Sequence, residues 1–221
     1  MSVALNDAMR QKLRHDDDDL LTSKSDSTSS DQQGECANGG ENKVVADLCA
    51  KYILDADKER TVILCVGTGT GLEAVQLRHR GFTRLHAHDG CERMLQEARK
   101  TGAFERYICE FLYTDKPTSA FQRNTYDVVV ISGSILPGCL ESGHLDELLR
   151  ITKVGGLNVI GVKDIYTRPM PQYDWHSNVE AKVQKFVDEN KIRLLERYVI
   201  SDWDNDHTNS THGVFYVYEK K

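Results

Sequence analysis

The sequence predicts an α/β fold: a doubly wound, mostly parallel sheet with helices on both faces. Short apolar runs alternate with stretches of helical spacing along most of the 221 residues, the pattern of parallel strands joined by helical crossovers. A glycine-rich turn at residues 67–71 directly follows the first apolar run. The last two apolar runs have no helix between them, which predicts an antiparallel pair at one edge of the sheet.

Residues 1–40 differ in composition from the rest of the chain. Residues 1–14 can form a short helix with a ragged apolar side, whereas residues 15–40 are rich in Ser, Asp, Gly and Gln and contain no aromatic residue, Val or Ile. Such a segment cannot bury enough apolar surface to offset the entropy of ordering, so we expect disorder. His15 and the four aspartates after it are interpreted as a solvated charge run rather than a metal site. Residues 41–221 are expected to form one domain.

The elements of this domain follow from periodicity. Helical spacing of Val44, Leu48 and Tyr52 predicts a first helix, and the uninterrupted apolar run of residues 126–132 predicts a strand buried on both faces. We expect helices at residues 41–53, 72–80, 91–100, 145–151 and 177–190. We expect strands at residues 62–66, 83–88, 106–113, 126–132, 157–162, 192–200 and 213–219.

Charge and cysteine usage limit the classes of function. The net charge is −6, but residues 15–42 alone carry eight acids and one base, which leaves about +1 for the remainder. The body therefore lacks the basic excess of a duplex nucleic-acid binder. No apolar run approaches the ~20 residues of a membrane span. The six cysteines are scattered without a CxxC pair, which fits a reducing compartment, the cytoplasm or nucleus, better than a disulfide or zinc scaffold.

The glycine turn indicates a nucleotide-like ligand. Gly67, Gly69 and Gly71 stand between an apolar strand and a helix, where glycine lets the backbone approach a ligand closely and the helix offers free N–H groups. A dinucleotide fingerprint requires a third glycine at position 72, which is Leu72 here. The pattern is therefore GxGxG. Tight packing in an ordinary strand–turn–helix unit is the alternative interpretation.

Asp89 is the second residue that indicates a nucleotide-like ligand. It closes the second predicted strand, 22 positions after Gly67, where a carboxylate can accept hydrogen bonds from both hydroxyls of a ribose. Alternatively, Asp89 caps the helix that begins near Cys91, and the two roles are compatible.

The sequence resembles class I S-adenosylmethionine-dependent methyltransferases. The resemblance rests on the glycine turn and Asp89, and on three segments that follow in the order and spacing of that family: HDGCERMLQEAR at 88–99, YDVVVISGSI at 126–135 and ITKVGGL at 151–157. In detail, residues 42–165 are similar to the methyltransferase-like family of the Williams–Beuren syndrome chromosome region. The resemblance implies a Rossmann-like, seven-stranded sheet with a reversed last strand and S-adenosylmethionine as cofactor. It implies nothing about the methyl acceptor.

The resemblance also implies roles for individual residues. The glycine turn would wrap the methionine part of the cofactor and Asp89 would hold the ribose. Gly90 and Met94 would flank the adenine, Asp115 would approach the adenine amino group, and Ser132 would face both cofactor and substrate. The implied cofactor-binding set is Gly67, Thr68, Gly69, Gly71, Asp89, Gly90, Met94, Asp115 and Ser132.

One position departs from the family. Many class I enzymes have an acid two residues before the first glycine, where this chain has Cys65. The role of that acid could pass to Glu73, or the chain could be an inactive cofactor-binding module. A nicotinamide-dependent oxidoreductase is a further alternative, which Leu72 disfavours.

The acceptor site is the least determined feature. Residues 201–207 hold Trp203, His207 and three aspartates, and the segment after the fifth predicted strand brings Tyr166, Tyr173, Trp175 and His176. We expect these to wall a pocket for a small molecule or a protein side chain, with an amine favoured and His207 or His176 as base. An ordinary surface loop is the alternative, which would place the acceptor beside Ser132 and Leu136. His86 and His88 share a strand face and are interpreted as structural rather than metal-binding.

Overall fold

The computed structural model describes residues 40–171, 176–201, 203 and 212–221. Of the segment expected to be disordered, only Gly40 is described, and it begins a helix; the rest of that segment, together with Tyr173, Trp175 and His207, lies outside the described residues. The strands are β1 (Val62–Val66), β2 (Arg84–Asp89), β3 (Arg106–Cys109), β4 (Tyr126–Ser132), β5 (Thr152–Lys163), β6 (Ile192–Ile200) and β7 (Gly213–Lys220). The α-helices are α2 (Gly40–Tyr52), α3 (Leu72–His79), α4 (Glu92–Lys100), α5 (Leu145–Ile151) and α6 (Val179–Asp188). Short 3-10 helices are η1 (Asp55–Arg60), η2 (Ser142–His144) and η3 (Asp164–Tyr166).

The strands form one seven-stranded sheet in the order β3-β2-β1-β4-β5-β7-β6. Strands β1 to β5 pair in parallel, and β7 lies between β5 and β6 and is antiparallel to both. The predicted doubly wound sheet with a reversed last strand is confirmed. The order reverses between β1 and β4, so a crevice opens beyond the carboxyl ends of the central strands, where ligands of such sheets bind.

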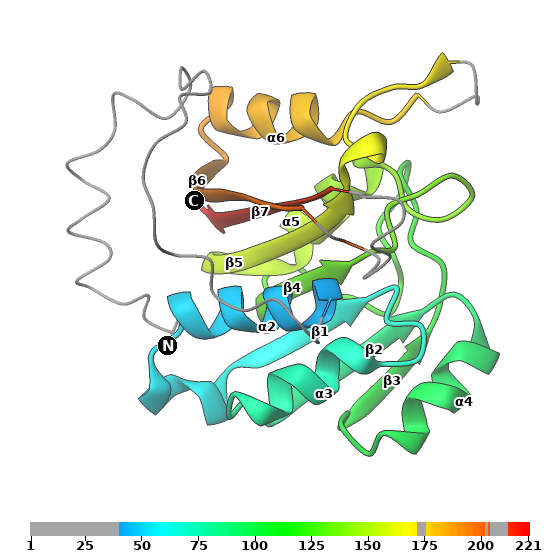
Figure 1. Cartoon of the computed structure of the whole chain (residues 1–221), viewed down its shortest axis with the longest axis vertical. Helices are drawn as coiled ribbons and strands as arrows, with labels where there is room; N and C mark the ends of the chain where they lie inside the picture. The colour runs from blue at the N-terminus through cyan, green and yellow to red at the C-terminus, as the bar shows by residue number, and fades with distance from the viewer. Residues whose placement is uncertain (1–39, 172–175, 202, 204–211) are drawn as a thin grey trace.

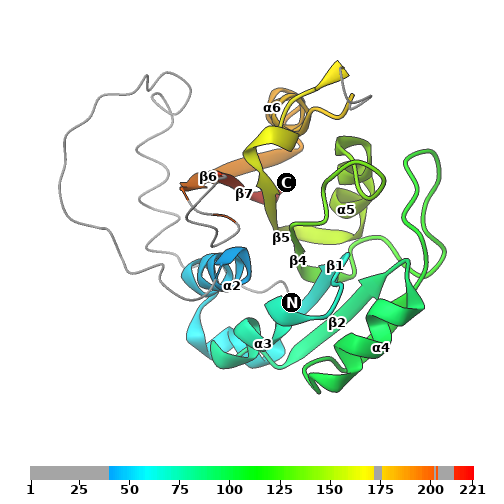
Figure 2. The same cartoon turned by 45° about the vertical axis from the view of Figure 1, so that its right-hand side comes forward.

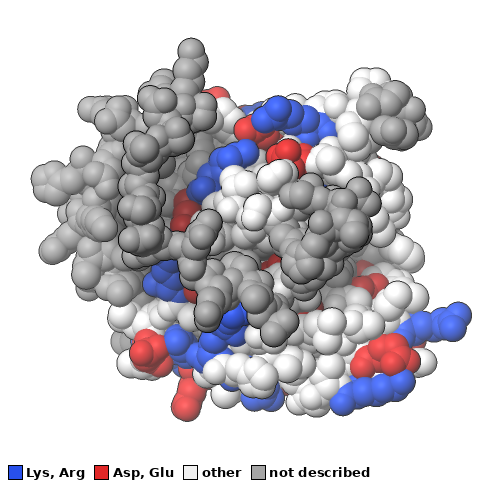
Figure 3. All heavy atoms as spheres, viewed as in Figure 1, with Lys and Arg blue, Asp and Glu red and all other residues white. Residues whose placement is uncertain are grey.

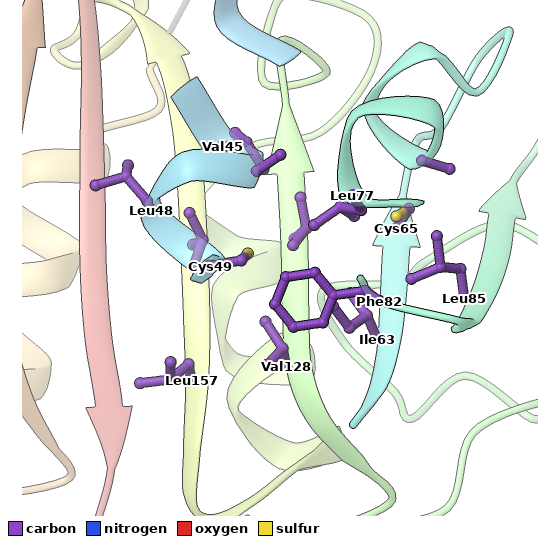
Figure 4. Close-up of a cluster of buried hydrophobic side chains, with 14 of the residues drawn as sticks. Val45, Leu48, Cys49, Ile63, Cys65, Leu77, Phe82, Leu85, Val128 and Leu157 are labelled. Atoms are coloured by element: carbon purple, nitrogen blue, oxygen red, sulfur yellow. The ribbon is translucent and has the colours of Figure 1, made fainter. Parts of the chain in front are cut away.

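Helices cover both faces of the sheet, as the views in Figures 1 and 2 show. Residues alternate along each central strand: Ile63 and Cys65 belong to one buried cluster, whereas Leu64 and Val66 belong to the other. The first cluster packs against α2, α3 and α4, and Figure 4 shows Cys49 and Leu77 converging on it. The second packs against α5 and α6. The sheet is thus held between two apolar layers, and only its strand ends are open.

Three elements differ in extent from the prediction. Strand β3 ends at Cys109, because Glu110 turns away and accepts hydrogen bonds from the backbone N–H groups of Ser119 and Ala120 at 3.0 Å each. Strand β5 begins at Thr152, ahead of the glycines, with a register shift and a φ of +76° at Gly155. Helix α6 begins later because the side chain of Asn178 accepts from the Ala181 N–H at 2.8 Å and so caps it.

The surface of the described residues is mixed in charge. In Figure 3 the basic and acidic side chains of that face lie next to one another, without a broad basic area among the residues drawn in colour. Among the described residues, no helix combines the length and the apolar character needed to cross a bilayer.

Candidate functional site

A cavity of about 580 Å³ lies beyond the carboxyl ends of β1, β2 and β4. The segments after these three strands supply most of its lining, and the first turn of α2 adds Glu41 and Asn42. Seven of the residues predicted to bind a cofactor line it: Gly67, Thr68, Gly69, Asp89, Gly90, Met94 and Ser132. The topology therefore brings together residues from three strands that are far apart in the sequence.

The three positions of the turn require glycine for different structural reasons. All three have positive φ, between +53° and +81°. A Cβ on Gly67 would lie 2.6 Å from the Cβ of Ser134, and one on Gly71 would lie 2.8 Å from the ring of Phe104. A Cβ on Gly69 would meet no protein atom within 4 Å. Gly67 and Gly71 thus permit close packing, whereas Gly69 faces open space in the cavity. Gly71 itself does not line the cavity.

Asp89 connects β2 to the glycine turn. One carboxylate oxygen accepts from the Gly69 N–H at 2.9 Å, and the other accepts from the Cys91 N–H at 2.8 Å. The second bond fixes the turn before α4, but it does not cap the helix: the N-cap is Cys91, and no described side chain accepts from the first N–H groups of α4. A carboxylate has about four acceptor sites, so both oxygens retain capacity for a ligand's hydroxyls. Asp89 can therefore still bind a ligand, whereas the prediction that it caps the helix is wrong.

A carboxylate of α3 lies next to Cys65, the position where many class I enzymes have an acid. Glu73 is buried and accepts hydrogen bonds from the hydroxyl of Thr68 and the thiol of Cys65, directly beneath the glycine turn. Burial raises the pKa of Glu73 to about 7, although both of these bonds lower it. Burial, and secondly the charge of Glu73, hold the pKa of the Cys65 thiol well above its ordinary value, so this thiol is not a nucleophile.

Two buried polar atoms of the lining have no hydrogen-bond partner among the described residues: Oγ of Ser132 and Nδ1 of His88. His88 Nε2 lies 2.7 Å from the carbonyl of Glu110 and donates to it, which leaves Nδ1 as an acceptor. Burial lowers the pKa of His88, so the ring is neutral. Unsatisfied buried polar atoms are rare and mark places where a ligand completes the hydrogen bonding.

The charged side chains of the lining are all acidic: Glu41, Glu73, Asp89 and Glu110. No Lys or Arg belongs to the described lining. In a cavity with apolar walls this arrangement gives a negative potential, which favours cationic or uncharged ligands and disfavours phosphates.

Several predicted residues lie elsewhere. Asp115 is exposed and outside the cavity, because β3 ends earlier than expected, and Glu110, Phe111 and Leu112 occupy this part of the lining instead. Trp203, expected in an acceptor wall, is 3 % exposed and stacks on Phe215 at 5.5 Å between ring centroids. This correction has a physical reason: the indole buries its large apolar surface over a glycine-containing part of β5 and β7.

Two further acceptor candidates also lie outside the lining. Tyr166 packs against the second buried cluster, and His176 is exposed. His86 contacts the Tyr126 ring edge-on, in agreement with a structural role. No group of three or more metal-binding side chains occurs among the residues described.

The sequence reasoning missed His144, Phe111 and the first turn of α2, all of which line the cavity. For the first turn of α2, the only signal in the sequence is that this helix precedes β1, with the short η1 between them. His144 and Phe111 lie in irregular segments whose place depends on the tertiary fold.

Residues 63–156 match a family model described as "Methyltransferase domain". This match spans β1 to β5 and all the strand ends that form the cavity. Residues 63–156 therefore carry a methyltransferase domain. S-adenosylmethionine is the cofactor that this family implies, and the open space at Gly69, the Asp89 carboxylate and the two unsatisfied atoms fit it. The predictions of family and cofactor are confirmed.

Relatives of the methyltransferase domain agree with this assignment. Methyltransferase-like protein 27 of Homo sapiens is 34% identical over 110 residues, which is 49% of this chain and 43% of that protein. The chain thus matches less than half the length of this relative.

Solved structures support the fold. A structure described as a putative S-adenosylmethionine-dependent methyltransferase from Listeria monocytogenes has a TM-score of 0.57 at 16% identity, covering 75% of this chain and 93% of that one. A putative methyltransferase from Haloferax volcanii, solved in complex with the Trm112 methyltransferase activator, has a TM-score of 0.59 at 18% identity, covering 81% and 90%. At such identities the likeness concerns the fold alone.

Proposed function

We propose that the chain transfers a methyl group from S-adenosylmethionine to a small-molecule or protein side-chain acceptor. The observation that carries the proposal is the convergence of the open Gly69 turn, the Asp89 carboxylate and the buried Glu73 at one cavity. When bound, the cofactor supplies an activated methyl on a sulfonium, so the protein's own task is mainly to align the acceptor and exclude water.

Each part of the cavity has a proposed role. Gly69 gives room for the methionine moiety, and Asp89 binds the ribose hydroxyls. Glu73 provides the negative charge for the cofactor's ammonium group in place of an acid at Cys65. Gly90, Met94 and Phe111 form the adenine site, where a Cβ on Gly90 would already meet the Phe111 ring at 2.7 Å.

We further propose that residues 41–221 form the functional unit and that the acidic segment before it is dispensable for cofactor binding. The acceptor site is proposed beside Ser132 and Leu136, the place that the sequence reasoning gave as its alternative, because both residues line the cavity. We propose the cytoplasm or nucleus as the compartment, because the cysteines are scattered and fit a reducing environment.

The test is transfer of tritiated methyl groups from S-adenosylmethionine into fractionated lysate, with small molecules separated from macromolecules. Time-dependent labelling of one fraction by the wild type, lost in Asp89→Ala, supports the proposal. Saturable cofactor binding without labelling of any fraction would favour the inactive binding module, for which Cys65 is the supporting feature.

A further inference from the structure

The segment between β4 and α5 forms a fixed wall of the cavity. Ile135 and Leu140 form an isolated bridge, and the Leu140 N–H donates to the Ser134 carbonyl at 3.1 Å. The Ser134 hydroxyl donates to the Val66 carbonyl at 3.2 Å, which fastens the wall to the end of β1. Leu136 and Leu140 present apolar lining from this segment.

The end of this wall is fastened to a second element. The Ser142 N–H donates to the Ser177 hydroxyl at 2.8 Å, and the Asn178 N–H donates to the Ser142 hydroxyl at 3.1 Å. This reciprocal pair attaches η2 to the start of α6. The last residue of η2 is His144, which is half-buried and lines the cavity.

The backbone determines which nitrogen of His144 carries the proton. The Glu141 N–H donates to Nδ1 of His144 at 2.9 Å, and the Glu141 side chain accepts from the His144 N–H. Nδ1 also lies 3.3 Å from the Glu141 carbonyl, but the contact with the N–H is shorter, and a backbone N–H can only donate. A nitrogen that accepts an N–H bond has no proton of its own, so the neutral ring carries its proton on Nε2. Nε2–H is therefore the polar group that the ring has left for a ligand.

This tautomer makes His144 a donor rather than a base. Nε2 is already protonated, and Nδ1 is occupied by the backbone, so neither nitrogen can take a proton from an acceptor. What the ring can do is hold an oxygen in place. The charged groups of the lining are carboxylates, and their negative charge disfavours an anionic ligand at the Nε2–H donor.

We propose that His144 positions the methyl acceptor by donating a hydrogen bond from Nε2–H, and that the acceptor is an uncharged, partly apolar molecule whose oxygen accepts this bond. The inference rests on the proposed methyl transfer and narrows its substrate class: Leu136 and Leu140 contact the apolar body, and the unsatisfied Ser132 hydroxyl lies in the same cavity. It replaces the amine acceptor and the histidine base that the sequence suggested.

The first test is the tautomer, which does not depend on activity. Nitrogen-15 NMR of the wild type saturated with S-adenosylhomocysteine at pH 8, with the His144 signals assigned by their loss in His144→Gln, should show a proton on Nε2. A proton on Nδ1 would overturn the inference.

The second test uses benzamide as a neutral oxygen-bearing probe, and benzoate and benzylamine as charged counterparts of similar shape. Benzamide should bind the S-adenosylhomocysteine complex best, about fivefold more weakly in His144→Ala, and near wild-type strength in His144→Gln, which keeps an N–H donor. His176→Ala is the matched control, because His176 lies outside the cavity lining, and it should change nothing.

Equal benzamide affinity in His144→Ala and wild type, no benzamide binding, or preference for benzoate would each contradict the inference. S-adenosylhomocysteine affinity should stay within about twofold in all three variants. Failure of the wild type to bind S-adenosylhomocysteine would instead count against the proposed function, so the two failures are distinguishable.

Discussion

Replacing Glu73 by Gln should make the protein more stable and its cofactor binding weaker at the same time. The side chain is buried, and its carboxylate accepts from Thr68 and Cys65 under the glycine turn. Gln keeps the size and one acceptor oxygen but removes the charge. The substitution therefore separates the cost of a buried charge from its proposed use, the binding of the cofactor's ammonium group.

The effect on stability follows from proton linkage. Burial raises the pKa of Glu73 from its ordinary 4.5 to about 7, so the folded protein holds this proton more tightly than the unfolded chain does. The free energy of unfolding therefore falls as the pH rises from 4.5 to 7. Each pH unit in this window corresponds to ~1.4 kcal/mol. We expect the stability of the variant relative to wild type to increase by about 3 kcal/mol between pH 4.5 and 8, or roughly 6–12 °C in Tm.

The effect on binding has the opposite sign. Loss of a hydrogen bond to a charged group costs roughly 1.5–3 kcal/mol, which weakens S-adenosylhomocysteine binding about 10- to 150-fold at pH 8. Below pH 7 the wild-type carboxyl must first lose its proton, so wild-type affinity should fall by up to about tenfold between pH 8 and 6. The variant, which has no proton to lose, should show a flat profile.

Thermal unfolding and isothermal titration calorimetry from pH 4.5 to 8 measure both quantities. Glu41→Gln is the matched control, since Glu41 lines the same cavity but is only half-buried, and it should show no comparable gain in stability. A variant whose stability follows the same pH dependence as wild type would refute the buried charge. Undiminished affinity at pH 8 would refute its role in cofactor binding.

Three further substitutions and one deletion test other parts of the site and fold. Gly69→Val should abolish S-adenosylhomocysteine binding in calorimetry, whereas Gly102→Val, with a similar φ of +63° and equally open space, should only reduce Tm; equal loss in both would point to backbone strain. Asp89→Ala should weaken binding at least about tenfold, and a change in Tm alone would leave only its structural bonds to the Gly69 and Cys91 N–H groups. Trp203→Ala should cost about 3–5 kcal/mol in urea unfolding, and less than 1 would contradict its burial. Deleting residues 1–39 should leave affinity unchanged, and a large loss would show that this segment covers the cavity.

Locally determined elements could be predicted from the sequence. Strands β1 and β4 and helix α5 have the predicted bounds, because uninterrupted apolar runs and helical spacing report directly on burial. The glycine turn could also be predicted, since glycine adopts positive φ values at the least steric cost. The position of Glu73 near the glycine turn could also be predicted from spacing, because residue 73 falls in the first helical turn beyond the glycines.

Features that depend on distant segments could not be predicted. Trp203 looks like an exposed loop residue in the sequence, yet a Cβ on Gly213 would meet its ring at 1.9 Å, so its burial depends on a glycine ten positions further along in β7. His144 carries no local signal, because its place in the cavity requires both the bridge after β4 and the attachment of η2 to α6. The acceptor wall is made of such segments, which is why the acceptor was the least predictable part.

The most direct test of the account is calorimetric titration of the full-length chain with S-adenosylhomocysteine at pH 8, with NAD titrated in parallel. We expect saturable one-to-one binding of S-adenosylhomocysteine that Gly69→Val abolishes, a rise in Tm on saturation, and no heat of binding with NAD. Binding of NAD instead, or S-adenosylhomocysteine affinity that Gly69→Val and Asp89→Ala leave unchanged, would contradict the assignment of this cavity as the cofactor site.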